Sequence, residues 1–167
     1  MKRKRRPVPP GEYQDPDLVF DPPVFADELE RSLAEDTVMV MKTAPFRAVP
    51  PDMPVEDMMR AMVRQDIACV VVLEHDKLLG VISERDILTR VAFQYEKVRR
   101  RPVREVMTRD PVFVRDTDSP ALALNLMAVG GFRHIPIVDV DGRVVGIIGP
   151  RRILNYLEPH FEAAPKS

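Results

Sequence analysis

Apolar residues recur with the spacing of an amphipathic helix in the segment after Pro54. They stand at i, i+3, i+4, i+7 and i+8, which places them on one helical face. The pattern predicts a helix with Asp52 as its N-cap and Pro54 near its first turn. Methionines on such a face either pack in a core or form an adaptable groove for a partner, and core packing is the commoner use. The apolar positions are Val55, Met58, Met59, Met62 and Val63.

Two short runs of aliphatic and β-branched residues follow this helix. They span Ile67 to Leu73 and Lys77 to Ile82, and the polar residues Glu74 to Asp76 separate them. This arrangement predicts a β-hairpin. Apolar positions between Ile87 and Val91 then indicate another helix.

The same order of elements returns after a constant shift of 66 residues. A fixed offset over so long a span indicates an internal duplication. Each copy is predicted to run strand, helix, strand, strand, helix, which gives an α+β fold of two units that bury surface against each other. Aligned pairs include Met41 and Met107, Pro45 and Pro111, Asp52 and Asp118, Gly80 and Gly146, and Leu88 and Leu154.

The second copy strengthens the hairpin prediction. Its two runs, Ile135 to Val138 and Val144 to Ile148, flank the pair Asp141-Gly142, which is a favoured turn sequence. The second helix of this copy is marked by apolar residues from Ile153 to Leu157.

Segments outside the two copies have a different character. Residues 1–23 are rich in proline and charge and are predicted to form a disordered tail, and residues 161–167 a C-terminal tail. Phe25, Leu29 and Leu33 recur every four positions, so residues 24–36 should hold a short helix that docks on the first copy or on a partner chain.

The link between the copies, Phe93 to Arg101, ends in three consecutive arginines. Such a run is usually a solvated linker, and the alternative is contact with phosphate or carboxylate groups. Another basic run, Lys2 to Arg6, opens the chain and is interpreted as part of the solvated tail.

Composition narrows the class of protein. The chain has 167 residues and a net charge of −1, so the whole molecule is not an evident polyanion binder. One cysteine, Cys69, excludes an intrachain disulfide and is expected to be a buried small apolar residue. No apolar run is long enough to cross a bilayer. We therefore predict a cytoplasmic protein with no membrane contact.

No catalytic or metal-binding arrangement stands out. The histidines, His75, His134 and His160, lack the spacing of metal ligands with one another or with Cys69. Familiar hydrolase and nucleotide-cleaving motifs are missing from the sequence. We predict that the protein is not an enzyme and needs no cofactor.

The turn from Gly80 to Asp86 supports two interpretations. Ser83 and Asp86 have the spacing of a capping-box variant, which stabilises a helix start by about 1 kcal/mol. In the second copy Gly149 and Pro150 also suit a helix start. The same turn could instead place helix amides near an anion while a carboxylate accepts ribose hydroxyls. Spacing alone favours capping.

Taken together, these motifs resemble a tandem pair of CBS domains, the Bateman regulatory module. The resemblance covers roughly Thr37 to Pro159 and implies CBS domains at residues 37–95 and 96–160, packed with pseudo-two-fold symmetry. Proteins of that family commonly bind adenine nucleotides between the two copies and often pair as homodimers. The carrying motifs are Met-x-x-x-Pro at Met41 to Pro45 and Met107 to Pro111, the strand Arg133 to Asp139, and Gly-h-h-Ser-x-x-Asp at Gly80 to Asp86.

The resemblance implies a role for each matching residue. Asp86 would hold the ribose hydroxyls, Ser83 would help to position the sugar or phosphate, and the segment of Thr43 and Pro45 would border the adenine. Arg133 and His134 would meet the phosphates across the cleft; otherwise they are a surface pair beside a strand. The implied nucleotide-binding residues are Asp86, Ser83, Thr43, Pro45, Arg133 and His134.

The second copy departs from this pattern. Gly149 and Arg152 replace the serine and aspartate, so the second cleft loses its ribose acceptor. Ile67 and Ala68 align with Arg133 and His134, so that cleft should also lack their phosphate donors. We therefore predict one competent site per chain.

Three functions remain open from the sequence. The first is a sensor that binds AMP, ADP or ATP and signals to an unidentified protein partner. The second is a ligand-free scaffold that dimerises and presents its N-terminal segment. Nucleic-acid binding through Lys2 to Arg6 and Arg99 to Arg101 is the weakest of the three.

Overall fold

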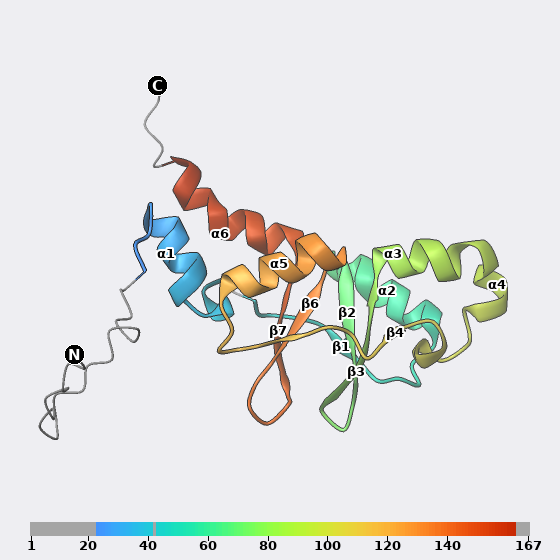
Figure 1. Ribbon diagram of the computed structural model, residues 1–167. Helices are drawn as coiled ribbons and strands as arrows, with labels where there is room; N and C mark the ends of the chain where they lie inside the picture. Colours follow the sequence, from blue (N-terminus) through green and yellow to red (C-terminus); the bar gives the residue numbers. More distant parts are fainter. Residues whose placement is uncertain (1–22, 42, 163–167) are drawn as a thin grey trace, which may run out of the picture.

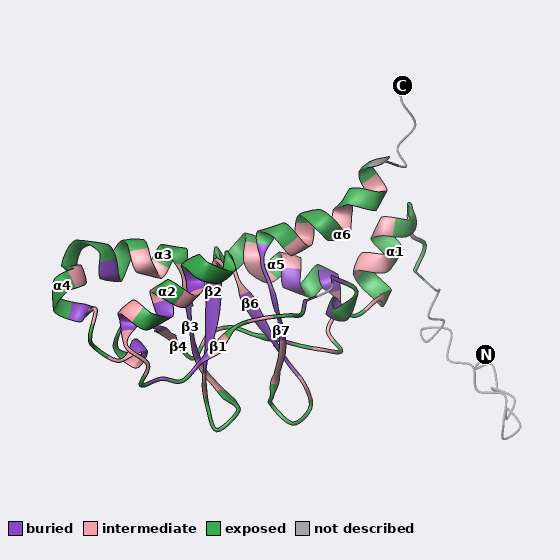
Figure 2. Cartoon of the chain, turned by 180° about the vertical axis from the view of Figure 1, so that it is seen from behind, coloured by how far each residue is buried: buried purple, intermediate pink, exposed green. Residues whose placement is uncertain are grey.

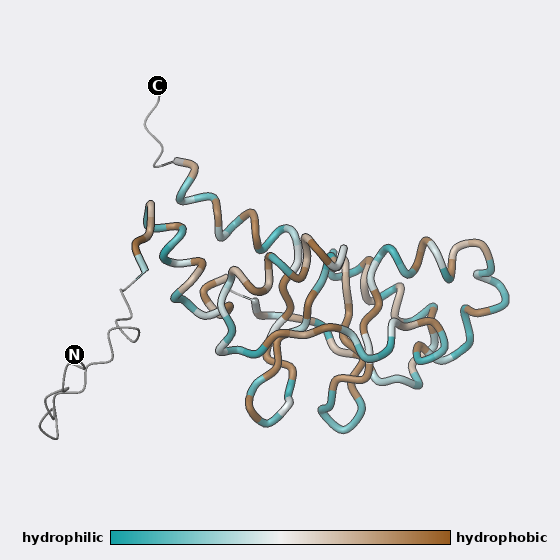
Figure 3. Tube along the Cα trace, viewed as in Figure 1, coloured by the Kyte–Doolittle hydropathy of each residue, from teal (hydrophilic) through white to brown (hydrophobic). Residues whose placement is uncertain are grey.

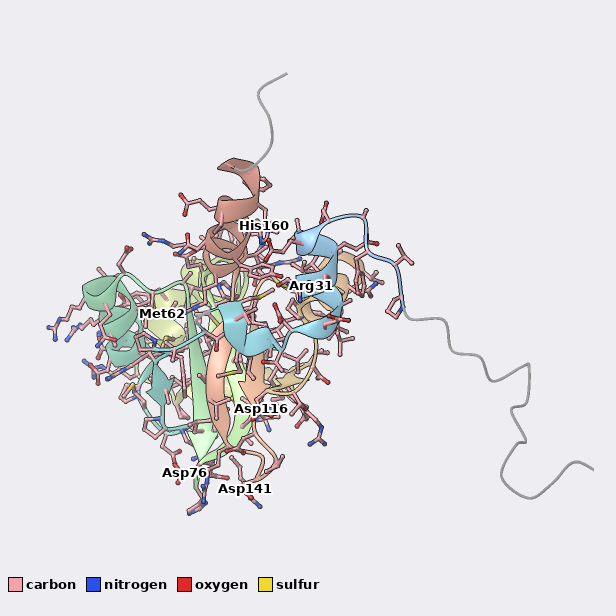
Figure 4. All side chains as sticks on the ribbon, turned by 90° about the vertical axis from the view of Figure 1, so that its left-hand side faces the viewer. Arg31, Met62, Asp76, Asp116, Asp141 and His160 are labelled. Atoms are coloured by element: carbon pink, nitrogen blue, oxygen red, sulfur yellow. The ribbon has the colours of Figure 1, made fainter. Side chains whose placement is uncertain are left out.

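A computed structural model describes residues 23–41 and 43–162 of the chain (Figure 1). The predicted N-terminal tail therefore lies outside the described residues, apart from Pro23. The described part is an α+β structure of two similar halves placed side by side, each with a hairpin that points to the same side (Figure 1). Asp76 and Asp141, labelled in Figure 4, lie at the ends of these two hairpins.

The first sheet has the order β1-β2-β3-β4, and its last strand comes from the second copy. β1 runs parallel to β2, while β2–β3 and β3–β4 are antiparallel. His75 and Asp76 form the hairpin turn with φ values of 50° and 63°, as a two-residue turn with both residues left-handed requires. The strands are β1 (Ala48–Val49), β2 (Cys69–Glu74), β3 (Lys77–Ser83) and β4 (Thr108–Arg109).

The second sheet has the order β5-β6-β7 and repeats the first three strands. β5 is parallel to β6, and β6 is antiparallel to β7. The hairpin strands have the bounds that the sequence predicts, and the Asp139 carboxylate accepts hydrogen bonds from the Asp141 and Arg143 amides in the turn. The strands are β5 (Val114–Arg115), β6 (Ile135–Val138) and β7 (Val144–Ile148).

Helices cover the sheets on one side. The helix of each copy that precedes the hairpin is confirmed, as α2 (Val55–Gln65) and α5 (Pro120–Gly130). The helix after the second hairpin, α6 (Pro150–Glu162), runs two residues past the start of the predicted C-terminal tail. Hydrophobic and hydrophilic residues alternate along it (Figure 3). The remaining helical segments are α1 (Glu28–Glu35), η2 (Val38–Met41), α3 (Glu84–Asp86), η3 (Ile87–Val91), η4 (Ala92–Gln94), α4 (Tyr95–Val98) and η5 (Val103–Glu105).

The start of α2 corrects one prediction. Asp52 is not the N-cap, since it lies in a preceding turn and pairs with Arg104, and Pro54 occupies the cap position. The carbonyl oxygens of Arg101 and Arg99 accept from the first amides of α2, at 3.0 Å from Val55 and 2.9 Å from Glu56. Carbonyl groups of the linker thus satisfy the first amides of α2, which a capping side chain would otherwise satisfy.

The linker is more ordered than the solvated segment favoured by the sequence. It contains η4 and α4, and Arg99 pairs with Glu56 at 3.2 Å and with Glu96 at 2.9 Å. Arg101 pairs with Glu105 at 2.9 Å. Two of the three linker arginines therefore contact carboxylates, which was the alternative interpretation of the run.

The N-terminal helix docks on the second copy rather than on the first. α1 packs against α5 and lies beside α6 (Figure 2). The Ser32 and Tyr156 hydroxyls, 2.7 Å apart, join α1 to α6. η2 follows, and its Val38 and Met41 enter the core of the second copy. The chain therefore crosses to the second copy before it forms β1.

The first segment of each copy packs against the other copy. Val103, Val106 and Met107 belong to the core of the first copy, and β4 pairs with β3. In return, the Ile147 amide donates to the Thr43 carbonyl oxygen at 3.2 Å. A third core joins the two halves and is composed of Cys69, Val71, Val81 and Ile147, with Phe46, Leu73, Leu78 and Val144 packed against it.

Candidate functional site

The turn between β3 and α3 holds the carboxylate that the sequence analysis singled out. Oδ2 of Asp86 accepts hydrogen bonds from the Ser83 amide at 2.9 Å and from the Ser83 hydroxyl at 2.7 Å. This arrangement confirms the capping-box interpretation of the turn. Both hydrogen bonds from Ser83 go to the same carboxylate oxygen of Asp86.

The other carboxylate oxygen joins the two copies. Oδ1 of Asp86 accepts from the Thr108 hydroxyl at 3.0 Å and lies 3.5 Å from Nη1 of Arg90. The Asp86 side chain is only 13% exposed. Because a carboxylate offers about four acceptor positions, Oδ1 has room for a further donor, or can exchange Thr108 for one.

A cavity of about 400 Å³ opens beside this carboxylate, and we call it the first cleft. It brings together four of the six residues expected at the site: Ser83 and Asp86 from the first copy, and Arg133 and His134 from the second. Other lining residues are Cys69, Val81, Arg85, Thr89, Arg90, Thr108, Gly130, Gly131 and Phe132.

Thr43 and Pro45 do not lie in the first cleft. Thr43 is buried beside Gly146, and Pro45 lines a different cavity. The cause is the exchange of first segments, which sends this part of the first copy to the second copy. Thr108 reaches Asp86 by the equivalent crossing in the other direction.

His134 lies where the two copies meet. Burial is the main cause that lowers its pKa, the Arg133 charge lowers it further, and the Asp86 charge opposes them. Nδ1 of His134 is buried and finds no hydrogen-bond partner within the described residues. The free protein therefore favours a neutral imidazole with one unused ring nitrogen.

Sequence reasoning missed Thr108 and Phe132. The offset of 66 pairs Thr108 with Lys42, so alignment of the copies gave it no special place. Phe132 packs closely over Gly130 at the end of α5 and adds an aromatic wall to the cleft. Aromatic residues after a helix have many structural uses, and only the fold places this one at the cavity.

Cys69 lies between the two cavities. It is 7% exposed, and burial, with a smaller contribution from the Asp86 charge, raises its pKa to about 12. The thiol therefore stays protonated and packs as a small apolar group, as predicted.

A second cavity of about 580 Å³, the second cleft, lies on the other side of Arg133 and His134. The sequence analysis expected this cleft to lack the phosphate donors aligned with Arg133 and His134; Ile67 and Ala68 do line it, but other residues supply cationic groups. Arg133 lines both clefts, and Arg47, Arg151 and Arg152 line the second. Comparison of aligned positions had pointed to Arg152, but Arg47, Arg133 and Arg151 come from separate segments that this comparison did not connect with the second cleft.

Other kinds of site find no support in residues 23–41 and 43–162. Within these ranges no three acidic, histidine or cysteine side chains are placed to hold a metal ion. None of the described helices combines the length and apolar character needed to span a membrane.

Two interlocked α+β repeats with a cleft on either side of their junction define a tandem pair of the Bateman type. The CBS domain profile matches residues 35–92 and 103–159. The chain belongs to the CBS domain family.

Similar proteins extend this finding. CBS domain-containing protein CBSCBSPB3 of Arabidopsis thaliana is 33% identical over 129 residues, covering 76% of this chain and 23% of its own. The chain thus spans about a fifth of the first curated relatives it matches. Among solved structures, the CBS-domain protein ATU1752 of Agrobacterium tumefaciens has 26% identity and a TM-score of 0.65, covering 71% of this chain and 97% of its own. CBSX2, solved in complex with AMP, has 25% identity and a TM-score of 0.62, covering 73% and 97%.

Proposed function

We propose that the protein is a regulatory sensor that binds an adenosine-containing nucleotide in the first cleft. The observation that carries the proposal is the meeting, in one cavity, of an acceptor from one copy and cationic or neutral donors from the other. Asp86 accepts the ribose hydroxyls, and Arg133 and His134 contact the phosphates. The AMP complex of CBSX2 supports this class of ligand.

Binding at Asp86 has a direct consequence for the packing of the two copies. Ribose hydroxyls compete with Thr108 and Arg90 for Oδ1, and Thr108 belongs to the strand that the second copy lends to the first sheet. Ligand occupancy therefore favours one arrangement of β4 over another, by as much as the ligand's affinity differs between them. A partner protein that contacts the second copy reads this change.

Titration calorimetry with AMP, ADP and ATP tests the site. Two charge-assisted hydrogen bonds of roughly 1.5–3 kcal/mol each predict that Asp86→Ala weakens binding at least tenfold. Arg152→Ala is the matched control in the second copy and should change the affinity little. Equal affinities for the wild type and Asp86→Ala would sink the assignment.

We further propose that the chain forms a homodimer through its helical side. Val63 and its aligned partner Val129 are 83% and 81% exposed, and Leu88 and Leu154 are 64% and 61% exposed. Matched apolar positions on the two copies suit a symmetric partner, since a two-fold interface repeats the same contacts. An apolar hollow of about 530 Å³ lies beside Val63 and Leu88.

Sedimentation analysis tests the dimer. Leu88→Glu combined with Leu154→Glu should give a monomer, because both copies then place charge in the interface. Val140→Glu changes an equally apolar residue, 80% exposed in the β6–β7 turn, and should leave the dimer intact. A wild-type protein that sediments as a monomer at micromolar concentration excludes this dimer. A cytoplasmic location and the lack of catalytic activity stay predictions.

A further inference from the structure

In the second cleft, the Arg152 side chain occupies the position where a nucleoside would need an acceptor for its ribose hydroxyls. Arg152 replaces the aspartate of the first copy, and its Nη2 donates to the Pro45 carbonyl oxygen at 2.8 Å. Its Nη1 donates to the Ala44 carbonyl oxygen at 3.2 Å. Burial of this guanidinium lowers its pKa, yet an arginine keeps its charge at any physiological pH. Because a guanidinium only donates, this end of the cleft has nothing to offer a ribose.

Three further arginines line the same cleft. Arg47 precedes β1, Arg133 precedes β6, and Arg151 lies in the first turn of α6. These three side chains, and that of Arg152, lie in no ion pair with any described carboxylate. Two acidic residues, Asp66 and Glu84, also line the cavity. Four positive charges thus face two negative ones in a partly enclosed space.

The local structure of α6 adds to this excess of positive charge. Its first turn holds Arg151 and Arg152 and contains no acidic residue. Cations at the N-terminus of a helix are unfavourable, because the backbone dipole is positive there. In the first copy the equivalent turn contains Glu84 and Asp86, the favourable choice. An anion between Arg47, Arg133 and Arg151 would relieve the repulsion in the second copy.

We propose that the second cleft binds a compact polyanion of the pyrophosphate or tripolyphosphate class and excludes nucleosides. Arg47, Arg133 and Arg151 hold the phosphate groups. Arg152 occupies the position that a sugar would take and donates to the carbonyl groups of Ala44 and Pro45. The two clefts then share Arg133, so each ligand alters the donors left for the other.

Calorimetric titration with pyrophosphate and tripolyphosphate tests the anion site. The double variant Arg47→Gln with Arg151→Gln should lose at least tenfold in affinity, because it removes two of the three donors. Arg85→Gln removes a cation of equal charge from the first cleft alone and should leave this affinity within about twofold. Equal binding of pyrophosphate by the wild type and the double variant, or no binding at millimolar concentration, overturns the proposal.

The same titrations separate a free polyphosphate from the phosphate tail of a nucleotide. ATP should bind with one equivalent per chain in the wild type and in the double variant, and adenosine should not compete with pyrophosphate. A second equivalent of ATP that disappears in the double variant would overturn the exclusion of nucleosides. Asp86→Ala should weaken ATP without weakening pyrophosphate, so this proposal and the nucleotide site can fail independently.

Discussion

The two clefts have the same origin and have acquired different chemistry. In the first, the turn from Ser83 to Asp86 provides an acceptor; in the second, the aligned turn provides Arg152 as a donor. The remaining difference is steric. A Cβ on Gly149 would lie 2.8 Å from Cδ2 and 3.0 Å from Nε2 of His134. A serine at position 149 would therefore crowd the imidazole that serves the first cleft.

Packing at the junction links the residues of the two clefts. His134 occupies space that a side chain at position 149 would need, whereas the first copy has Ala68 at the position aligned with His134. Glycine at 149 thus permits the histidine. Packing at the junction therefore disfavours a serine at position 149, and Arg152, at the position aligned with Asp86, donates instead to the Ala44 and Pro45 carbonyl oxygens.

Copying the second turn onto the first gives the largest expected effect. Asp86→Arg removes the ribose acceptor and introduces a donor, so nucleotide affinity should fall at least about a hundredfold. Asp57→Arg makes the same change of charge on an exposed face of α2 and should leave the affinity unchanged. Circular dichroism checks that both variants are folded, and nucleotide binding retained by a folded Asp86→Arg would contradict the account.

The exchange of first segments predicts a loss of stability when either of two aligned glycines, Gly80 and Gly146, is replaced. A Cβ on Gly80 would lie 2.6 Å from Met107 Sδ and 2.7 Å from the Thr108 carbonyl oxygen. Overpacking of this kind costs about 1–3 kcal/mol, so Gly80→Ala should lower the melting temperature by several degrees. Gly146→Ala should cost a similar amount, because a Cβ there would lie 2.7 Å from Cβ of Thr43, a buried side chain that cannot move without its backbone. A Gly80→Ala protein as stable as the wild type would exclude the close crossing of β4.

A smaller effect concerns pH. Burial lowers the pKa of His134 in the free protein, which favours the neutral imidazole, and a bound phosphate raises that pKa again. The complex then takes up a proton, so affinity should rise, by roughly threefold, as pH falls from 8 to 6. His134→Gln should lose this rise in affinity. Because the phosphate titrates in both complexes, the difference between the affinity–pH profiles of the wild type and His134→Gln reports the histidine alone. Identical profiles for the two proteins would show that His134 does not contact the ligand.

Local patterns predicted most of the secondary structure. The alternation of apolar and turn residues gave both strands of the second hairpin with their observed bounds, and periodicity gave α2 and α5. Asp52 was misassigned because the carbonyl groups of Arg99 and Arg101, distant in sequence, satisfy the start of α2. A capping rule that considers only adjacent residues has no means to include them.

The part of the candidate site that consists of local motifs was predicted, and the part that depends on contacts distant in sequence was not. The turn of Ser83 and Asp86 and the strand that begins after Arg133 and His134 are local motifs, and the fold brings them together. Thr108 lies in the first cleft, where Thr43 and Pro45 were expected, because the two copies exchange their first segments. This exchange depends on packing between strands that are distant in sequence. Arg47 and Arg133 lie in segments separate from the Arg151-Arg152 pair, so no single sequence motif joins the four arginines of the second cleft.

The number of nucleotides bound per chain tests the central claim most directly. Equilibrium dialysis of the wild-type protein over a range of labelled AMP or ATP concentrations should saturate at one equivalent, and Asp86→Ala should need an at least tenfold higher free concentration for half-saturation. Two equivalents per chain, or the same half-saturation concentration for the wild type and Asp86→Ala, would contradict the assignment of a single nucleotide site to the first cleft.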